Sequence, residues 1–155
     1  MKRSATCLLA LLVSLLGAVA PASAADPLEV RDAWIRQPPP GTNAAAYMTL
    51  HNPGTEALRV VGVHSPAAER TELHRSVVED GVARMRPVEA IEVPAGGSVE
   101  LAPRGLHLML IRPRALRLGE TVGLTLELDG GGSVVVQALV RSAAHPAAGH
   151  SGGHH

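Results

Sequence analysis

Turn-forming segments rich in proline and glycine divide the chain into short pieces, and no other sequence feature constrains the fold as strongly. The segments between them are rich in β-branched and aliphatic residues and show no convincing 3.6-residue period. Short apolar segments bounded by turn signals are typical of β-strands. The turn segments are QPPPG (37–41), NPGTE (52–56), EDG (79–81), PAGG (94–97), PRG (103–105) and DGGG (129–132). We expect strands at 28–36, 45–51, 58–63, 70–74, 82–88, 98–101, 107–111, 122–128 and 133–140.

About seven to nine short strands at this spacing predict an all-β domain built as a Greek-key β-sandwich. A length of 155 residues agrees with one domain. Trp34 and Tyr47 are the only aromatic residues, so Val, Leu, Ile and Ala must build the core. Met48 alternates with Leu50 and is expected to pack in that core.

The first 24 residues are typical of a secretory signal peptide. A short basic region precedes an apolar run at 7–20, and Ala22-Ser23-Ala24 supplies a small-residue cleavage pattern. The apolar run is shorter than the ~20 residues that a membrane-spanning helix needs. We therefore expect cleavage after Ala24 and export to the periplasm. Cys7 lies at the start of the apolar run and not after it, which disfavours a lipid anchor there.

Composition excludes several classes of function for the exported chain. Cleavage removes the only cysteine, and with it disulfides, thiol nucleophiles and thiolate metal ligands. Basic and acidic residues balance at 14 each in the full chain and stand at 12 against 14 after cleavage, which leaves no positive excess for binding nucleic acid. No Ser-His-Asp order, phosphate-binding loop or carboxylate pair points to an enzyme. We expect a non-enzymatic monomer with no membrane span in the mature form.

The last residues differ in composition from the rest of the chain. From 143 on there is no aliphatic residue larger than alanine, and four of the eight histidines lie here: His145, His150, His154 and His155. This composition predicts a disordered tail at 143–155 after a folded domain at 25–142. Neutral imidazoles on such a tail bind Cu(II) or Zn(II), and an end with no role is the alternative.

Two short patterns bring histidine and methionine together. His107 and Met109 are two residues apart in an expected strand, so their side chains share one face. Asp80-Gly81 is a strong signal for a two-residue hairpin turn. In that hairpin Ser76 pairs with Met85 and His74 with Pro87, which makes His74 and Met85 diagonal neighbours on one face.

Two imidazoles and two thioethers form a soft, uncharged ligand set that suits Cu(I). Zn(II) more usually recruits cysteine or carboxylate beside histidine. A blue-copper electron-transfer site needs a cysteine thiolate, which the mature chain lacks. On spacing alone the alternative stays open that the methionines fill the core and the histidines lie at the surface.

The segment 65–111 closely resembles the periplasmic copper chaperones of the PCuAC type. Their signature is His, ten residues, Met, twenty-one residues and His-x-Met, and it is matched without a gap by His74, Met85, His107 and Met109. DAWIR (32–36), AAYMTLHNPG (45–54) and MRPVEAIEVP (85–94) are similar as well, so the likeness covers about 27–141. Members often carry extra methionines where this chain has Arg75, Val78 and Ala83, so several Cu(I) ions on this face are not expected.

The resemblance implies a cupredoxin-like fold and delivery of Cu(I) toward the CuA centre of cytochrome c oxidase. We therefore expect a chaperone that binds one Cu(I) through the four signature residues and passes it to oxidase subunit II or a Sco-type protein. Alternatives are a copper buffer or resistance protein without a dedicated acceptor, a copper oxidase and a metal-free interaction module. Four uncharged ligands leave little open coordination for oxygen, which disfavours the oxidase. Trp34 either anchors the core or shields an edge of the metal site.

Overall fold

The computed structural model describes residues 28–142, which form ten β-strands and no helix. Within this part of the chain, no helix is long and apolar enough to cross a membrane. The expected signal peptide at 1–24 and the expected tail at 143–155 lie outside the described residues. The strands are β1 (Glu29–Arg36), β2 (Ala44–His51), β3 (Leu58–His64), β4 (Ala68–Glu79), β5 (Val82–Pro87), β6 (Ile91–Val93), β7 (Ser98–Leu101), β8 (Leu106–Pro113), β9 (Thr121–Leu128) and β10 (Ser133–Arg141).

The all-β prediction is confirmed, with two corrections to the expected strands. β6 was not expected, because its three residues are too few to show an alternating pattern. β4 was expected to end at His74 but continues to Glu79. Its second half is only partly buried and carries polar residues, so hydrophobic alternation fades there although the backbone stays paired with β5.

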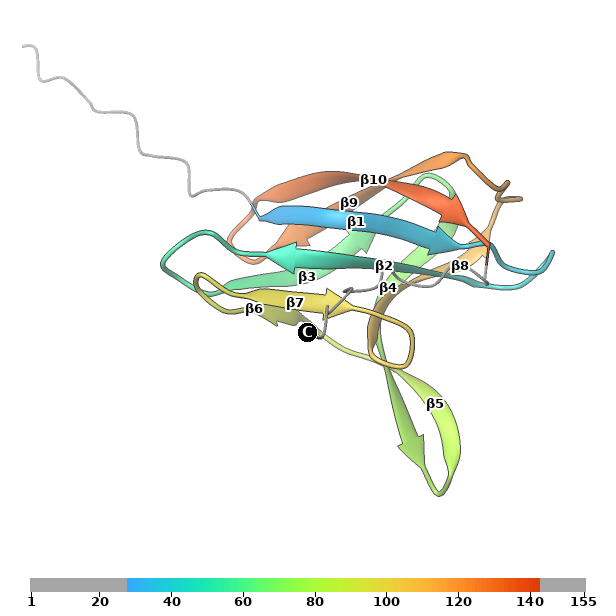
Figure 1. The fold of residues 1–155 in the computed structure, drawn as a ribbon, viewed down its shortest axis with the longest axis horizontal. Coiled ribbons are helices and arrows are strands. Elements are labelled where there is room, and N and C mark those ends of the chain that lie inside the picture. The colour runs from blue at the N-terminus through green and yellow to red at the C-terminus, as the bar shows by residue number, and fades with distance from the viewer. Residues whose placement is uncertain (1–27, 143–155) are drawn as a thin grey trace, which may run out of the picture.

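The strands hydrogen-bond in one path, in the order β5-β4-β8-β2-β1-β10-β9-β3-β6. β7 pairs with the second half of β2, while β8 pairs with its first half, so β7 and β8 share one edge of that strand. β1 and β10 run parallel, and the other pairs are antiparallel. The path curls until β3 lies against β4, where the Thr71 hydroxyl donates a hydrogen bond to the Val63 carbonyl (Figure 1).

The enclosed core is almost entirely aliphatic. Met48 is 2% exposed and belongs to it, which confirms the expectation for that residue. Burial of each large aliphatic side chain contributes about 1.5–3 kcal/mol, so the core stabilises the fold without any aromatic anchor. Its fully buried large side chains include Ile35, Leu50, Ile91, Leu101, Leu108, Leu110, Leu124 and Leu126.

A β-bulge interrupts the pairing of β1 with β2. Arg31 pairs with Thr49, but the next pair is Trp34 with Tyr47, so β1 carries one extra residue. Asp32 within the bulge has a φ of 52°. Before the bulge Val30 packs toward the core, and after it Ile35 does, with Trp34 on the outer face. The extra residue therefore exchanges the two faces of the strand.

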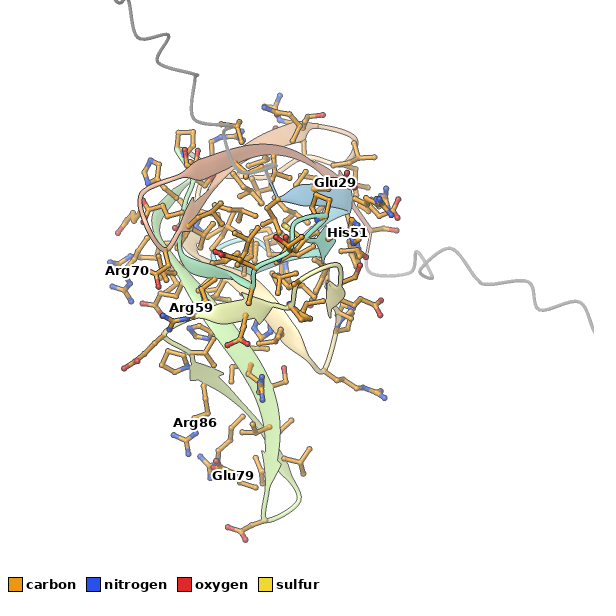
Figure 2. All side chains as sticks on the ribbon, turned by 90° about the vertical axis from the view of Figure 1, so that its left-hand side faces the viewer. Glu29, His51, Arg59, Arg70, Glu79 and Arg86 are labelled. Carbon is orange, nitrogen blue, oxygen red and sulfur yellow. The ribbon has the colours of Figure 1, made fainter. Side chains whose placement is uncertain are left out.

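The hairpin of β4 and β5 has the register that its turn residues predict. Ser76 pairs with Met85 and His74 with Pro87. Asp80 and Gly81 have φ values of 51° and 75°, the left-handed conformation that a type I′ turn needs at both positions. Figure 1 shows this hairpin projecting away from the rest of the molecule. In Figure 2 Glu79 and Arg86 lie together on it, joined by an ion pair of 2.7 Å.

The turn conformation makes Gly81 sensitive to substitution. An added Cβ would meet no atom within 4 Å, so the cost of Gly81→Ala comes from the backbone alone. A left-handed conformation costs a non-glycine residue about 1 kcal/mol, and we expect hairpin amides to exchange with solvent about fivefold faster. Hydrogen exchange followed by NMR measures this. Gly123→Ala is the control, because its φ is not positive and its nearest new contact is at 3.8 Å. Equal exchange in both variants would contradict the assigned turn.

Candidate metal centre

The four residues expected to bind metal lie on one face of the β5-β4-β8 ribbon, opposite the core. His74 pairs directly with His107, and Met109 lies two residues further along β8. Met85 pairs with Ser76, which shares its face with His74. The neighbouring residues in the chain, Leu73 and Leu108, point the other way into the core. The structure thus brings together on one face all the residues that the spacing selected.

The two imidazole rings are close enough to share one ion. Their centroids are 5.8 Å apart, with the ring planes inclined by 59°. Metal–nitrogen bonds of ~2.0 Å put the centroids of two rings on one metal roughly 6 Å apart at most. His107 is 1% exposed, and the His74 side chain is 12% exposed. Both rings are therefore held by packing before any ion arrives.

Each histidine uses one ring nitrogen in a hydrogen bond and leaves the other without a partner. His74 Nε2 donates to Glu72 Oε2 at 2.8 Å, and His107 Nδ1 donates to the Gly105 carbonyl at 3.2 Å. The remaining nitrogens, His74 Nδ1 and His107 Nε2, are buried and make no hydrogen bond. A buried polar atom without a partner is costly, and metal ligation removes that cost. A carboxylate or carbonyl on the opposite nitrogen is the usual support for a metal-binding histidine.

Burial favours the uncharged form of the His107 imidazole, and hydrogen bonding favours the ionised form of the Glu72 carboxylate. Burial lowers the pKa of His107 below its ordinary value, although the hydrogen bond to Gly105 acts in the opposite direction. The pKa of Glu72 is also lowered, chiefly by the hydrogen bond from His74. Neutral imidazole is the form that binds a metal, so His107 does not have to lose a proton first.

The two methionines differ in exposure. Met109 is 8% exposed and lies between Ala45 of β2 and Glu72 of β4, whereas Met85 is 55% exposed on the hairpin. Met85 borders a hollow of about 820 Å³ together with His107, and a second hollow of about 350 Å³ together with Met109. The candidate site therefore has three largely buried members and one that solvent and other molecules can reach.

An aromatic row extends the site toward β1. The Trp34 and Tyr47 rings are 4.7 Å apart, and the centroid of Tyr47 is 6.4 Å from that of His107. Burial raises the pKa of Tyr47, so its phenol remains protonated. Of the two roles expected for Trp34, the shielding of the site fits its position, because the ring lies on the outer face. Sequence reasoning did not select Tyr47, since alternation alone does not show which strand β8 lies beside.

The other histidines of the described chain lie apart from this site. His51 Nδ1 is 2.9 Å from Ser98 Oγ, and Figure 2 places His51 far from the hairpin that carries Glu79. His64 is exposed at the end of β3. In residues 28–142 no three His, Cys, Asp or Glu side chains are close enough together to hold a metal ion. The tail histidines His145, His150, His154 and His155 lie outside the described residues.

Sequence comparison identifies a family. The family model described as "Putative lipoprotein LpqE-like" matches residues 28–140, which is most of the chain. A protein of Leifsonia xyli subsp. xyli named "Putative lipoprotein Lxx21020" is 32% identical over 147 residues, and the alignment covers 88% of each chain.

Structural comparison identifies similar folds. A copper-bound PCuAC domain from PmoF2 has a TM-score of 0.64 and 26% identity, covering 77% of this chain and 96% of that one. The Cu(I) form of DR1885 from Deinococcus radiodurans has a TM-score of 0.64 and 34% identity, covering 79% of this chain and 83% of that one. These findings confirm the expected likeness to PCuAC proteins and the cupredoxin-like β fold.

The hydrogen bonds predict the tautomer of each ring. In metal-free protein, the uncharged His74 ring should carry its proton on Nε2 and the uncharged His107 ring on Nδ1, because those nitrogens donate to Glu72 and Gly105. Long-range ¹H–¹⁵N correlation spectra of the imidazoles distinguish the two tautomers. His51 is an internal reference, because it lies outside the site. The opposite tautomer would put a proton on His74 Nδ1 or His107 Nε2, and that nitrogen could then not bind a metal, which would contradict the assigned site.

Proposed function

The chain belongs to the LpqE-like family, and on that basis we propose that it is a copper chaperone that binds Cu(I) through His74, Met85, His107 and Met109. The observation that carries the proposal is the pair of buried ring nitrogens without hydrogen-bond partners, on the face that also presents two thioethers. Copper-bound relatives of the same fold support the choice of metal. Thioether sulfur prefers Cu(I), and imidazole accepts copper in either oxidation state.

The site is better suited to carrying an ion than to catalysis. Two histidines and two methionines fill the coordination that Cu(I) prefers and leave little room for a substrate. Met85 is the exposed ligand, so an acceptor can displace its thioether first while three buried ligands still hold the ion. Exchange of one ligand at a time lets copper pass between proteins without entering water. The chain therefore acts as a non-enzymatic carrier.

The acceptor and the compartment follow from the family likeness. We propose delivery toward the CuA centre of cytochrome c oxidase, directly to its subunit II or beside a Sco-type protein. The lipoprotein names of the family and of the Leifsonia relative support export. Residues 1–24 would then be removed as a signal peptide, and residues 25–142 would work as one monomeric periplasmic domain.

The substitution Met109→Leu tests whether Met109 is a copper ligand or only a core residue. Leucine preserves volume, and such swaps cost less than ~1.5 kcal/mol of folding stability. We expect Cu(I) affinity to fall about tenfold or more, and Cu(II) affinity to fall less, because thioether is a poor partner for the harder ion. Competition with a chromogenic Cu(I) chelator and a thermal melt of the copper-free protein measure the two quantities.

Met48→Leu is the matched control for that experiment. Met48 is buried even more deeply than Met109 but faces the core, so its replacement should leave Cu(I) affinity unchanged. Equal Cu(I) affinity in both folded variants would remove Met109 from the site and weaken the assignment of Met85, which rests on the same soft-ligand chemistry.

Removal of the tail tests whether it belongs to the Cu(I) site. Truncation after Ala144 deletes His145, His150, His154 and His155. Because the four proposed Cu(I) ligands lie in the domain, Cu(I) affinity should stay nearly unchanged, while additional uptake of Cu(II) or Zn(II) should be lost. Equilibrium titration of both forms with each ion measures this. A collapse of Cu(I) affinity on truncation would place the Cu(I) site elsewhere than on β4, β5 and β8.

A further inference from the structure

The exposed side of the candidate metal centre opens into the hollow of about 820 Å³ that Met85 and His107 border. The projecting hairpin contributes Val78, which is 75% exposed, and Ala83 to its lining. Met85 itself is 55% exposed. Apolar side chains gathered around a concave surface are typical of contact with another molecule rather than with water.

The same hollow is positively charged. Arg36 and Arg104 line it, and no aspartate or glutamate does. Among the described residues neither arginine forms an ion pair, and the Nε atom of Arg36 is buried without a hydrogen-bond partner. The hairpin arginines are different, because Arg84 and Arg86 are both paired with Glu79. Two guanidinium groups that form no ion pair thus line the same hollow as His107 and Met85.

We propose that this hollow docks the copper acceptor, through a segment that presents a carboxylate to Arg36 and Arg104 and apolar side chains to the hairpin. The proposal rests on the proposed function, since it names the chemistry of the partner that reaches Met85. Arginine binds carboxylates in a two-pronged geometry, which fixes the orientation of the docked segment as well as attracting it. An oriented segment can bring its own ligand to the exposed thioether.

The positive charge of bound Cu(I) strengthens the preference of the hollow for an acidic segment. Two neutral imidazoles and two thioethers do not cancel the positive charge of Cu(I), so the loaded hollow is more positive than the empty one. An acidic segment is therefore attracted more strongly before transfer than after it. The acceptor segment therefore binds the copper-loaded protein more tightly, and it dissociates more readily once the ion has left.

Two synthetic peptides test the proposal. Both contain a His-x-Met acceptor and apolar residues, and one carries glutamates where the other carries glutamines. Stopped-flow measurements follow Cu(I) transfer from the loaded mature protein to each. We expect transfer to the glutamate peptide to be about tenfold faster. The advantage should shrink between about 0.05 M and about 0.5 M salt, because screening weakens exposed charge interactions.

Variants of the protein test whether the faster transfer to the glutamate peptide depends on the arginines of the hollow. Arg104→Gln should remove most of the glutamate advantage without changing Cu(I) affinity, since Arg104 is exposed and is not a ligand. Arg36→Gln should do the same and serves as the second variant. Arg117→Gln is the control, because Arg117 is exposed and does not line the hollow. Equal transfer to both peptides at normal Cu(I) affinity, or an advantage that survives both hollow variants, overturns the proposal.

Titration of copper-free protein separates this proposal from the proposed function. The glutamate peptide should shift the backbone amide signals of Ser76, Ala83 and Arg104 at lower concentration than the glutamine peptide. That result would support the docking surface even if the protein failed to bind Cu(I), which would contradict the chaperone function alone. Equal shifts with both peptides, or concentration-dependent broadening of these signals without peptide, which would assign the hollow to a second copy of the chain, overturn the proposal.

Discussion

The pairing of β4 with β8 is the interaction on which both the fold and the candidate metal centre depend. On the inner face this ladder places Leu73 beside Leu108 in the aliphatic core. On the outer face, one residue along each strand, it places His74 beside His107. Because side chains alternate along a strand, the core contacts fix the register and the register fixes the imidazole pair. Burial of the apolar side chains on the inner face therefore also fixes the arrangement of the two histidines on the outer face.

This coupling explains why much of the site could be predicted from the sequence. Asp80-Gly81 specifies a turn of known register, so the pairing of Ser76 with Met85 follows from local chemistry. The spacing of His107 and Met109 likewise needs only strand alternation. The pairing of His74 with His107 is different, because it depends on which strands become neighbours, and no local rule supplies that. The family signature, not the physics of the segment, brought those two residues together at the level of sequence.

The parts that sequence reasoning missed are those set by long-range packing. Tyr47 reaches His107 only because β2 lies beside β8, and Trp34 packs against Tyr47 only because of the bulge in β1. The hydrogen bond between Glu72 and His74 could have been suspected from the sequence, since residues two apart in a strand share a face. β6 is too short for its pattern to be recognised, and it forms because β3 offers it an edge.

The bulge at Asp32 determines which residues in the second half of β1 face the core and which face outward. Residues 32 and 33 together oppose the single residue Met48 of β2, whereas each paired residue elsewhere in β1 has one partner there. Deletion of one of these two residues would leave a regular ladder in which Trp34 still points outward and Ile35 inward. Deletion of Ile35 itself would instead turn Arg36 inward and put its guanidinium group into the aliphatic core. Loss of one residue is therefore tolerated at the bulge far better than in the regular part of β1, where it would exchange side chains of the core with those of the face that carries the candidate metal centre.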